Sequence, residues 1–225
     1  MQQYEIEVKS LLGTKENVDH LKFLLKKNKN LKLIGKGKQL NHYFNTPTDL
    51  ASVYDAVLPY IFTKNIPAFK QILKEGKNVS IRTRGADKKV LFIIKASIND
   101  HSSHNGVSRI EFEAETKSLT LLKLDQILLD LGLTYQAKWS REREEYQVGN
   151  IHICLDKNAG YGYLAEFELI VDNKSKVKKA KDEVLIFMNS LGFSELSQDR
   201  LERMFAYYNK HWNEYYGTDK MFVIE

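Results

Sequence analysis

The sequence lacks a second cysteine, a long hydrophobic run and any low-complexity linker. Its only cysteine, Cys154, cannot form an intrachain disulfide, which is typical of a protein from a reducing compartment. Apolar runs such as those at 90–94 and 127–129 are far shorter than the roughly 20 residues that a membrane-spanning helix needs. The first residues show no signal-peptide pattern. We therefore expect a cytoplasmic protein with no membrane partner.

The composition is that of an ordinary globular chain. Of its 225 residues, 43% are hydrophobic and 28% are charged, which suffices for one sizeable core, and no internal repeat is evident. We predict a single domain at 1–210, interrupted by an insertion at 51–78, and a C-terminal tail at 211–225. The sequence does not indicate an oligomeric state.

The net charge of +5 suggests an anionic partner. A domain that binds RNA or DNA would gather lysine and arginine on an outer stripe with few acids between them. In this chain acidic and basic residues instead interleave on the same strand faces. The sequence therefore disfavours nucleic acid as the partner.

Hydrophobic periodicity predicts four helices and eight strands. Apolar residues recur at helical spacing after Thr14, a candidate N-cap, and in segments that close at Gly132 and Gly192, and a fourth helix is expected at 198–210. Period-two alternation predicts strands at 4–9, 39–44, 79–84, 90–96, 108–115, 140–148, 151–156 and 163–171. Several strands follow one another between helices, which favours an α+β fold with an antiparallel sheet.

Charged residues share a face on most of these strands. Alternation places Glu5, Glu7 and Lys9 on one side of the first strand, and Ile6 and Val8 on the other. On the later strands, charged residues likewise fall on a common face. These sets are Arg82 with Arg84, Arg109 with Glu111 and Glu113, Arg141 with Arg143, and Glu166 with Glu168, which follow Asp156 on the preceding strand. If the strands close into an eight-stranded antiparallel β barrel flanked by helices, these charges point into its lumen.

Such an interior requires charged ligands. Carboxylates about 4 Å apart repel by roughly 4 kcal/mol at an effective dielectric constant of about 20, so clustered glutamates imply a bound cation. Mg²⁺ and Mn²⁺ prefer oxygen ligands of this kind. Clustered arginines imply an anion, because the guanidinium group fits phosphate oxygens in bidentate geometry. Together these groups indicate a site for a metal-chelated polyphosphate.

The order of the motifs resembles the CYTH family, the triphosphate tunnel metalloenzymes, which include class IV adenylyl cyclases and thiamine and inorganic triphosphatases. The chain carries the family's Glu-x-Glu-x-Lys signature at 5–9. Its later segments are similar to further family motifs in family order: the Gln-x-Asp-x-Tyr-Phe-Asp-Thr-Pro segment at 39–47, Leu-Arg-Ile-Arg at 81–84, the lysine at Lys95, Arg-x-Glu-x-Glu at 109–113, Lys-x-Arg-x-x-Tyr at 141–146, and an aspartate at Asp156 followed by the glycine of a turn at Gly162 and by Glu-x-Glu at 166–168. The resemblance covers residues 4 to 210.

The resemblance implies an enzyme with Mg²⁺ or Mn²⁺ as cofactor and a nucleoside triphosphate or another triphosphate as substrate. It implies triphosphate binding by Lys9, Arg82, Arg84, Lys95, Arg109, Arg141 and Arg143. It implies metal binding by Glu5, Glu7, Glu111, Glu113, Asp156, Glu166 and Glu168. No nucleophilic side chain is assigned, because the sequence shows no Ser-His-Asp or Cys-His arrangement and no glycine-rich phosphate loop after a strand.

Two enzymatic interpretations stay open. Family triphosphatases of the thiamine and inorganic type commonly carry a basic residue where this chain has Val8. The segments at 39–44 and 156–168 are also similar to the cyclase branch, which favours a class IV adenylyl cyclase that converts ATP to cyclic AMP and pyrophosphate. An inorganic, thiamine or nucleoside triphosphatase is the alternative. A non-catalytic polyphosphate-binding module would need only the basic half of the site.

A few residues depart from the family pattern or lie beside it. Asn41 and Asn45 stand where acids are usual. His42 alternates out of phase with Asn41, so we expect a packed or exposed histidine rather than a ligand. His152 and Cys154 share the parity of the site residue on their strand and would line the lumen, but no further Cys/His spacing indicates a zinc site.

Overall fold

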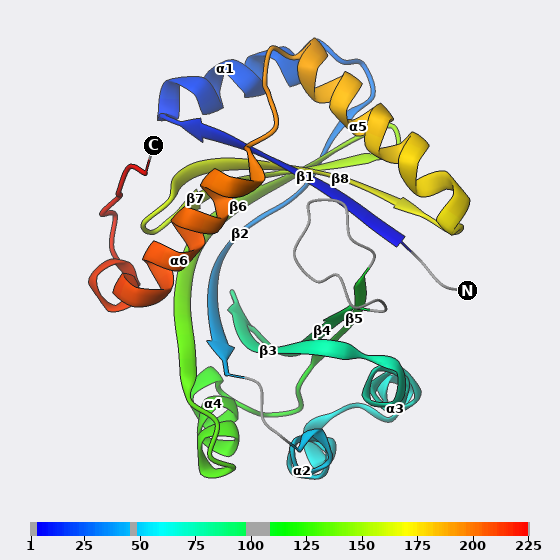
Figure 1. The fold of residues 1–225 in the computed structure, drawn as a ribbon, viewed down its shortest axis with the longest axis vertical. Coiled ribbons are helices and arrows are strands. Elements are labelled where there is room, and N and C mark those ends of the chain that lie inside the picture. The colour runs from blue at the N-terminus through cyan, green and yellow to red at the C-terminus, as the bar shows by residue number, and fades with distance from the viewer. Residues whose placement is uncertain (1–3, 46–48, 98–108, 225) are drawn as a thin grey trace. The chain divides into compact units, whose positions relative to one another are not determined.

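The chain folds around one eight-stranded antiparallel sheet with helices packed against it (Figure 1). The computed structural model describes residues 4–45, 49–97 and 109–224. The α+β class and all eight predicted strands are confirmed. Thr46, Pro47 and Ser108, which belong to predicted segments, lie outside the described residues. No helix within the described ranges is long and apolar enough to cross a membrane.

Strands and helices follow the predicted order along the chain. The strands are β1 (Tyr4–Gly13), β2 (Leu31–Phe44), β3 (Lys77–Ala86), β4 (Lys89–Ser97), β5 (Arg109–Glu115), β6 (Tyr135–Val148), β7 (Ile151–Asn158) and β8 (Gly162–Val171). The helices are α1 (Lys15–Lys26), α2 (Leu50–Val57), α3 (Ile66–Glu75), α4 (Leu121–Asp130), α5 (Val177–Ser190) and α6 (Gln198–Tyr215). The strands pair in the order β1-β8-β7-β6-β2-β3-β4-β5.

Two compact units make up the chain. Unit 1 holds the described residues up to Lys38 and from Ser140 onward, and unit 2 holds those from Gln39 to Trp139. The boundary falls within β2 and within β6, so each of these long strands contributes residues to both units.

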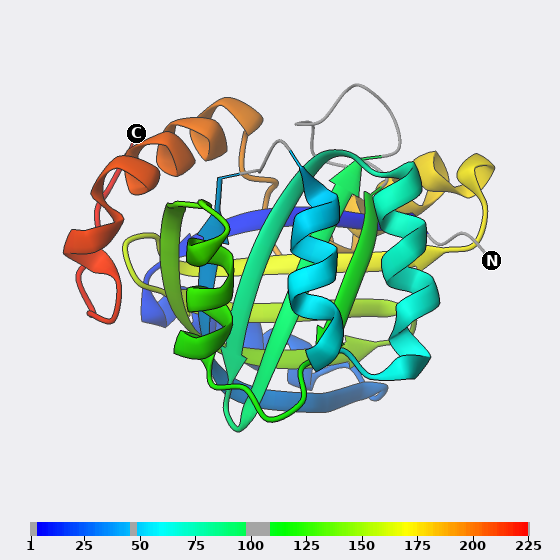
Figure 2. The same cartoon turned by 90° about the horizontal axis from the view of Figure 1, so that it is seen from below.

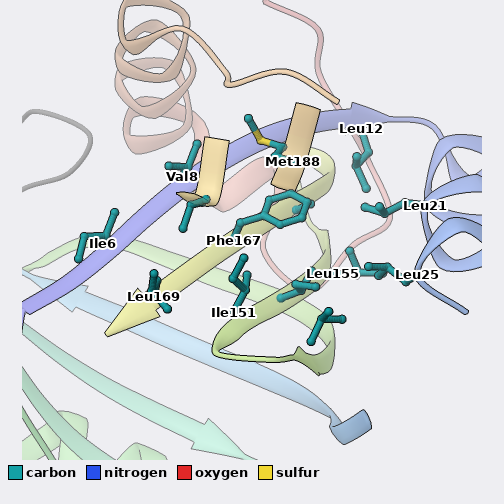
Figure 3. Close-up of a cluster of buried hydrophobic side chains, with 14 of the residues drawn as sticks. Ile6, Val8, Leu12, Leu21, Leu25, Ile151, Leu155, Phe167, Leu169 and Met188 are labelled. Carbon is teal, nitrogen blue, oxygen red and sulfur yellow. The ribbon is translucent and has the colours of Figure 1, made fainter. Parts of the chain in front are cut away.

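The core of unit 1 lies between the sheet and two helices. In Figure 1, α1 and α5 lie on the same side of β1 and β8; α5 contacts both strands and α1 contacts β1. Val8 of β1, Phe167 of β8 and Met188 of α5 come together there (Figure 3), and each is fully buried. Thr14 caps α1 as predicted, since its hydroxyl accepts a hydrogen bond from the Asn17 backbone N–H at 3.3 Å. Burying each such apolar side chain contributes about 1.5–3 kcal/mol, which fixes the face that β1 turns to the core.

Unit 2 has a core of its own, formed by β3, β4, β5 and three helices. The cyan helices α2 and α3 and the green helix α4 cover one face of these strands (Figure 2). Phe69 of α3 stacks on Phe112 of β5 with ring centroids 4.6 Å apart. The predicted insertion at 51–78 contains α2 and α3, so it is helical and supplies part of this core.

Most strands extend beyond their predicted bounds, and the largest extensions are in β2, β6 and α6. β2 begins at Leu31 and β6 at Tyr135, each several residues before the predicted start. Helix α6 continues to Tyr215, beyond the predicted end at 210. The residues after α6 pair with the turn between β7 and β8, where the Gly160 N–H donates to the Lys220 carbonyl at 2.9 Å and the Phe222 N–H donates to the Gly160 carbonyl at 2.8 Å.

Candidate functional site

Strand β1 presents charged side chains on the face opposite the core of unit 1. Ile6 and Val8 are fully buried in the apolar core, so alternation turns Glu5, Glu7 and Lys9 to the other face. These three residues keep part of their surface exposed. The parity predicted from the sequence is therefore present in β1.

Three carboxylates gather on this face of unit 1. Glu7 stands directly opposite Glu168 in the ladder between β1 and β8. One oxygen each from Glu5, Glu7 and Glu168 lies within 4.8 Å of the others. Oxygens on opposite sides of an octahedral Mg²⁺ are about 4.2 Å apart, since each lies about 2.1 Å from the ion. The spacing and the donor type of this group, the acidic trio, fit a hard divalent cation.

A chain of ion pairs runs beside the acidic trio. The Lys9 ammonium contacts the Glu7 carboxylate and donates to Glu166 Oε1 at 2.9 Å. The Arg143 guanidinium donates to both oxygens of Asp156, at 2.7 and 2.6 Å, and also contacts Glu166. Arg141 donates to Asp156 Oδ2 at 2.9 Å. The predicted phosphate-binding residues of unit 1 thus share one network with predicted metal ligands.

The ion pairs keep the buried members of this network charged. Burial opposes ionisation of Glu166, but Lys9, Arg143 and Arg141 outweigh it and hold the pKa of this carboxyl well below its usual value. Burial also opposes the charge on Arg143, and Glu166 and Asp156 outweigh that effect and raise its pKa. The acid and the arginine therefore both stay ionised near neutral pH.

A histidine, a cysteine and a further glutamate lie next to these acids. The His152 Nδ1 atom is 2.9 Å from Glu168 Oε2 and 3.8 Å from Cys154 Sγ, and its Nε2 atom is 3.3 Å from Glu145 Oε2. These neighbours raise the pKa of His152, and burial raises the pKa of the Cys154 thiol to about 11. Glu145 was not predicted, although it shares the parity of Arg143 on the same strand.

Unit 2 carries a second set of charged groups. The Arg84 guanidinium donates to Asn41 Oδ1 at 2.7 Å and to Glu113 Oε2 at 3.0 Å. The Lys95 ammonium is 3.0 Å from Glu111 Oε2. Asn41 stands where the family pattern has an acid, and its side-chain oxygen still accepts a hydrogen bond from Arg84. Neither glutamate belongs to the three groups of candidate metal ligands found among the described residues.

Arg82 is the most buried of the predicted phosphate-binding residues in unit 2, with 9% of its surface exposed. Its guanidinium carbon lies 4.6 Å from the centroid of the Tyr43 ring, a cation–π contact. Its Nε atom is buried without a hydrogen-bond partner among the described residues. For Arg109 the structure gives only the backbone, which pairs with Ser97 at the start of β5.

The opposite face of unit 2 holds a buried polar network centred on Asp125 of α4. The His42 Nδ1 atom is 2.6 Å from one oxygen of Asp125, the Tyr135 hydroxyl donates to the same oxygen at 2.9 Å, and the Thr83 hydroxyl donates to the other at 2.5 Å. Only 1% of Asp125 and 2% of His42 is exposed. His42 is therefore a packed histidine, as its alternation predicts.

The fold and the charged strand faces define an α+β protein that binds a charged ligand. The sequence matches the CYTH domain over residues 3–201, nearly its whole length, and the chain belongs to this family. The family consists of metal-dependent enzymes, and its members act as adenylyl cyclases or triphosphatases. A search of curated protein sequences gave no significant match.

Solved structures with the same fold agree with this assignment. A candidate adenylate cyclase from Vibrio parahaemolyticus aligns with a TM-score of 0.61 and 15% identity, over 92% of this chain and 99% of that chain. A protein from Pyrococcus horikoshii aligns with a TM-score of 0.60 and 20% identity, over 87% and 94%. A candidate adenylyl cyclase from Hippeastrum, described as having a dominant triphosphatase activity, aligns with a TM-score of 0.51 and 15% identity, over 90% and 95%.

Proposed function

We propose that this chain is a Mg²⁺- or Mn²⁺-dependent enzyme that acts on a triphosphate. The observation that carries the proposal is the acidic trio of Glu5, Glu7 and Glu168, which stands beside the ammonium group of Lys9. Three negative charges this close repel one another, and the single positive charge of Lys9 offsets only part of that repulsion, so a divalent cation would stabilise the group. The neighbouring arginines suit phosphate oxygens. A bound divalent ion would neutralise charge that builds on the phosphoryl oxygens as the bond breaks.

In unit 1 we assign phosphate binding to Lys9, Arg141 and Arg143. These cations are paired with Glu7, Glu166 and Asp156. A phosphate would share or replace those contacts. Asp156 accepts from both arginines, so we propose that it orients them, in addition to its predicted role as a metal ligand.

In unit 2 we assign phosphate binding to four further cations. Arg82 supports this assignment most strongly, because its buried Nε–H group has no hydrogen-bond acceptor among the described residues and could donate to a phosphate oxygen. The side chains assigned to phosphate here are Arg82, Arg84, Lys95 and Arg109, and Glu111 and Glu113 are kept as predicted metal ligands. No side chain is assigned as a nucleophile, which leaves a hydroxyl of the substrate or a water molecule to attack the phosphorus.

A class IV adenylyl cyclase is the more specific proposal. Val8 occupies the position at which related triphosphatases carry a basic residue, and it is fully buried in the apolar core. A charged side chain there would lose the packing of that core and would need a partner of its own. In a cyclase the ribose 3′-hydroxyl attacks the α-phosphorus of ATP, and pyrophosphate leaves.

Triphosphatase activity is the second candidate. The Hippeastrum protein that shares this fold is described with a dominant triphosphatase activity, and hydrolysis makes fewer demands on the site. Cyclisation requires the nucleoside to be held so that its 3′-hydroxyl is in line with the α-phosphorus. Hydrolysis requires only the triphosphate and a positioned water molecule.

The two candidates give different products. The purified chain is incubated with ATP, and separately with inorganic triphosphate, in Mg²⁺ or Mn²⁺, and the products are resolved by chromatography. We expect cyclic AMP and pyrophosphate from ATP, and little orthophosphate from inorganic triphosphate. Rapid orthophosphate release without any cyclic nucleotide would identify a triphosphatase. Full turnover in excess EDTA would exclude both proposals, since both depend on a divalent metal.

A further inference from the structure

Strands β6 and β7 bring a mixed set of ligand atoms together in unit 1. Glu145 and Cys154 stand directly opposite each other in the ladder, and His152 lies two residues along β7 on the same face. Atoms of the Glu145 carboxylate, the His152 imidazole and the Cys154 thiol all lie within 4.8 Å of one another. These three residues form what we call the sulfur site.

The donors of the sulfur site differ in kind from those of the acidic trio. Magnesium prefers oxygen ligands, whereas a thiolate and an imidazole together favour zinc and similar transition metals. At a tetrahedral zinc ion, with sulfur at about 2.3 Å and nitrogen at about 2.05 Å, these two ligand atoms are about 3.6 Å apart. Cys154 Sγ and His152 Nδ1 are 3.8 Å apart, so little movement is needed to bind such an ion.

One ligand of the sulfur site is buried and two are partly exposed, which suits a metal ion that keeps one coordination position open to solvent. Cys154 is fully buried, whereas the side chains of His152 and Glu145 are 27% and 33% exposed. The partly exposed side leaves room for a water molecule as a fourth ligand. Glu168, which contacts His152 Nδ1 and also belongs to the acidic trio, would give up this contact to the bound ion, because one ring nitrogen cannot both bind a metal and donate to a carboxylate.

We propose that Glu145, His152 and Cys154 bind a thiophilic divalent cation of the zinc class, at a site separate from the acidic trio. Binding releases the thiol proton of Cys154 and any proton on His152 Nδ1 to solvent, because the ligands are the thiolate and the neutral imidazole nitrogen. The proposal does not rest on the proposed function, since it concerns binding rather than turnover.

A cobalt titration tests the proposal directly. Co²⁺ reports thiolate ligation through a sulfur-to-cobalt charge-transfer absorption, and Cys154 is the only cysteine of the chain. Such a band in the tag-free protein therefore reports Cys154 alone. We expect the band to saturate at one equivalent of Co²⁺, to disappear on addition of Zn²⁺, and to persist in a large excess of Mg²⁺.

Four variants separate a built site from chance thiol binding. Cys154→Ser should abolish the band, and His152→Gln and Glu145→Gln should each weaken Co²⁺ binding by at least about tenfold. Glu5→Gln, which alters the acidic trio, should leave the band unchanged, and circular dichroism verifies folding. A folded wild-type protein without the band overturns the proposal, and so does a band whose affinity is unchanged in both His152→Gln and Glu145→Gln. The wild-type titration can overturn the proposal even if a variant does not fold, and His152→Gln and Glu145→Gln are independent tests of the two other ligands.

Discussion

Glu7 and Glu168 face each other as direct cross-strand partners, with Glu5 completing the trio. Like charges directly opposite on antiparallel strands destabilise a sheet. The repulsion between Glu7 and Glu168 is not relieved by a shift in register, because burial of Ile6 and Val8 on the other face of β1 fixes the register of this strand. Such a placement is understandable if a cation occupies the site during function.

A divalent cation should therefore stabilise the fold. Mg²⁺ or Mn²⁺ at about 100 times its Kd should contribute roughly 2.7 kcal/mol of stability and raise the Tm, because the ion binds the folded state alone. Glu7→Gln should remove most of this rise, since it deletes one negative charge from the acidic trio. Differential scanning calorimetry with and without metal measures the effect. Glu183→Gln, the same substitution at an exposed position on α5, is the control, and an equal rise in both variants would argue against the trio as the metal site.

Turnover should depend on both halves of the predicted site. Glu7→Gln removes metal-binding charge and Arg84→Ala removes a donor to phosphate, so each should lower kcat/KM at least about 100-fold, or about 2.7 kcal/mol. The measurement is steady-state kinetics with whichever triphosphate the chain turns over. Ile6→Val, on the core face of β1, should cost about 0.5–1.5 kcal/mol in stability and leave kcat/KM intact. Near-normal turnover in both charge variants would mean that these strand faces do not carry the site.

The network around Asp125 should matter for stability and not for chemistry. Asp125→Ala removes the shared acceptor of the buried His42 and Thr83 side chains and the half-buried Tyr135, and losing a buried acceptor costs about 1–3 kcal/mol for each donor. We expect a loss of about 3 kcal/mol or more in urea unfolding. Asp130→Ala, at an exposed position on the same helix, should change stability by less than about 0.5 kcal/mol. Similar losses in the two variants would contradict the structural role of the network.

Gly160 should tolerate a side chain poorly, because Tyr208 of α6 and Phe222 beyond this helix lie against it. Its φ is +80°, and a Cβ atom there would meet the Tyr208 ring at 2.6 Å and Phe222 at 3.0 Å. Gly149 has a φ of +58° but open space around it. Gly149→Ala should cost only the left-handed backbone strain, about 1–2 kcal/mol, whereas Gly160→Ala should cost about 1–3 kcal/mol more. Chemical denaturation of both variants measures the difference, and equal costs would show that Tyr208 and Phe222 yield easily.

Alternation made β1 and the division of its residues between two faces predictable. In this strand each residue type agrees with the face it occupies, so Ile6 and Val8 indicate the core and Glu5, Glu7 and Lys9 the opposite face. The early part of β2 was missed because its lysines and two glycines, at 31–38, have little strand propensity. Pairing with neighbouring strands overrides that propensity, and pairing across the sheet is not visible in a local pattern.

The unpredicted contacts join residues far apart in the sequence. Asp125 lies in an otherwise apolar helical pattern, and its partner His42 is 83 residues away, so nothing local indicates that this acid is buried. Glu145 could have been found, because it shares a face with Arg141 and Arg143. It was overlooked because the family pattern assigns no role to that position.

The strict alternation of β1 also means that its core-facing residues and its charged residues can be mutated independently. Positions 6, 8, 10 and 12 are buried, and positions 5, 7 and 9 are not. A combinatorial library restricted to the even positions would change the packing of the core and leave the charged face unaltered. If the proposed site lies on that face, a library restricted to the odd positions would alter its ligand selectivity and leave the core unaltered.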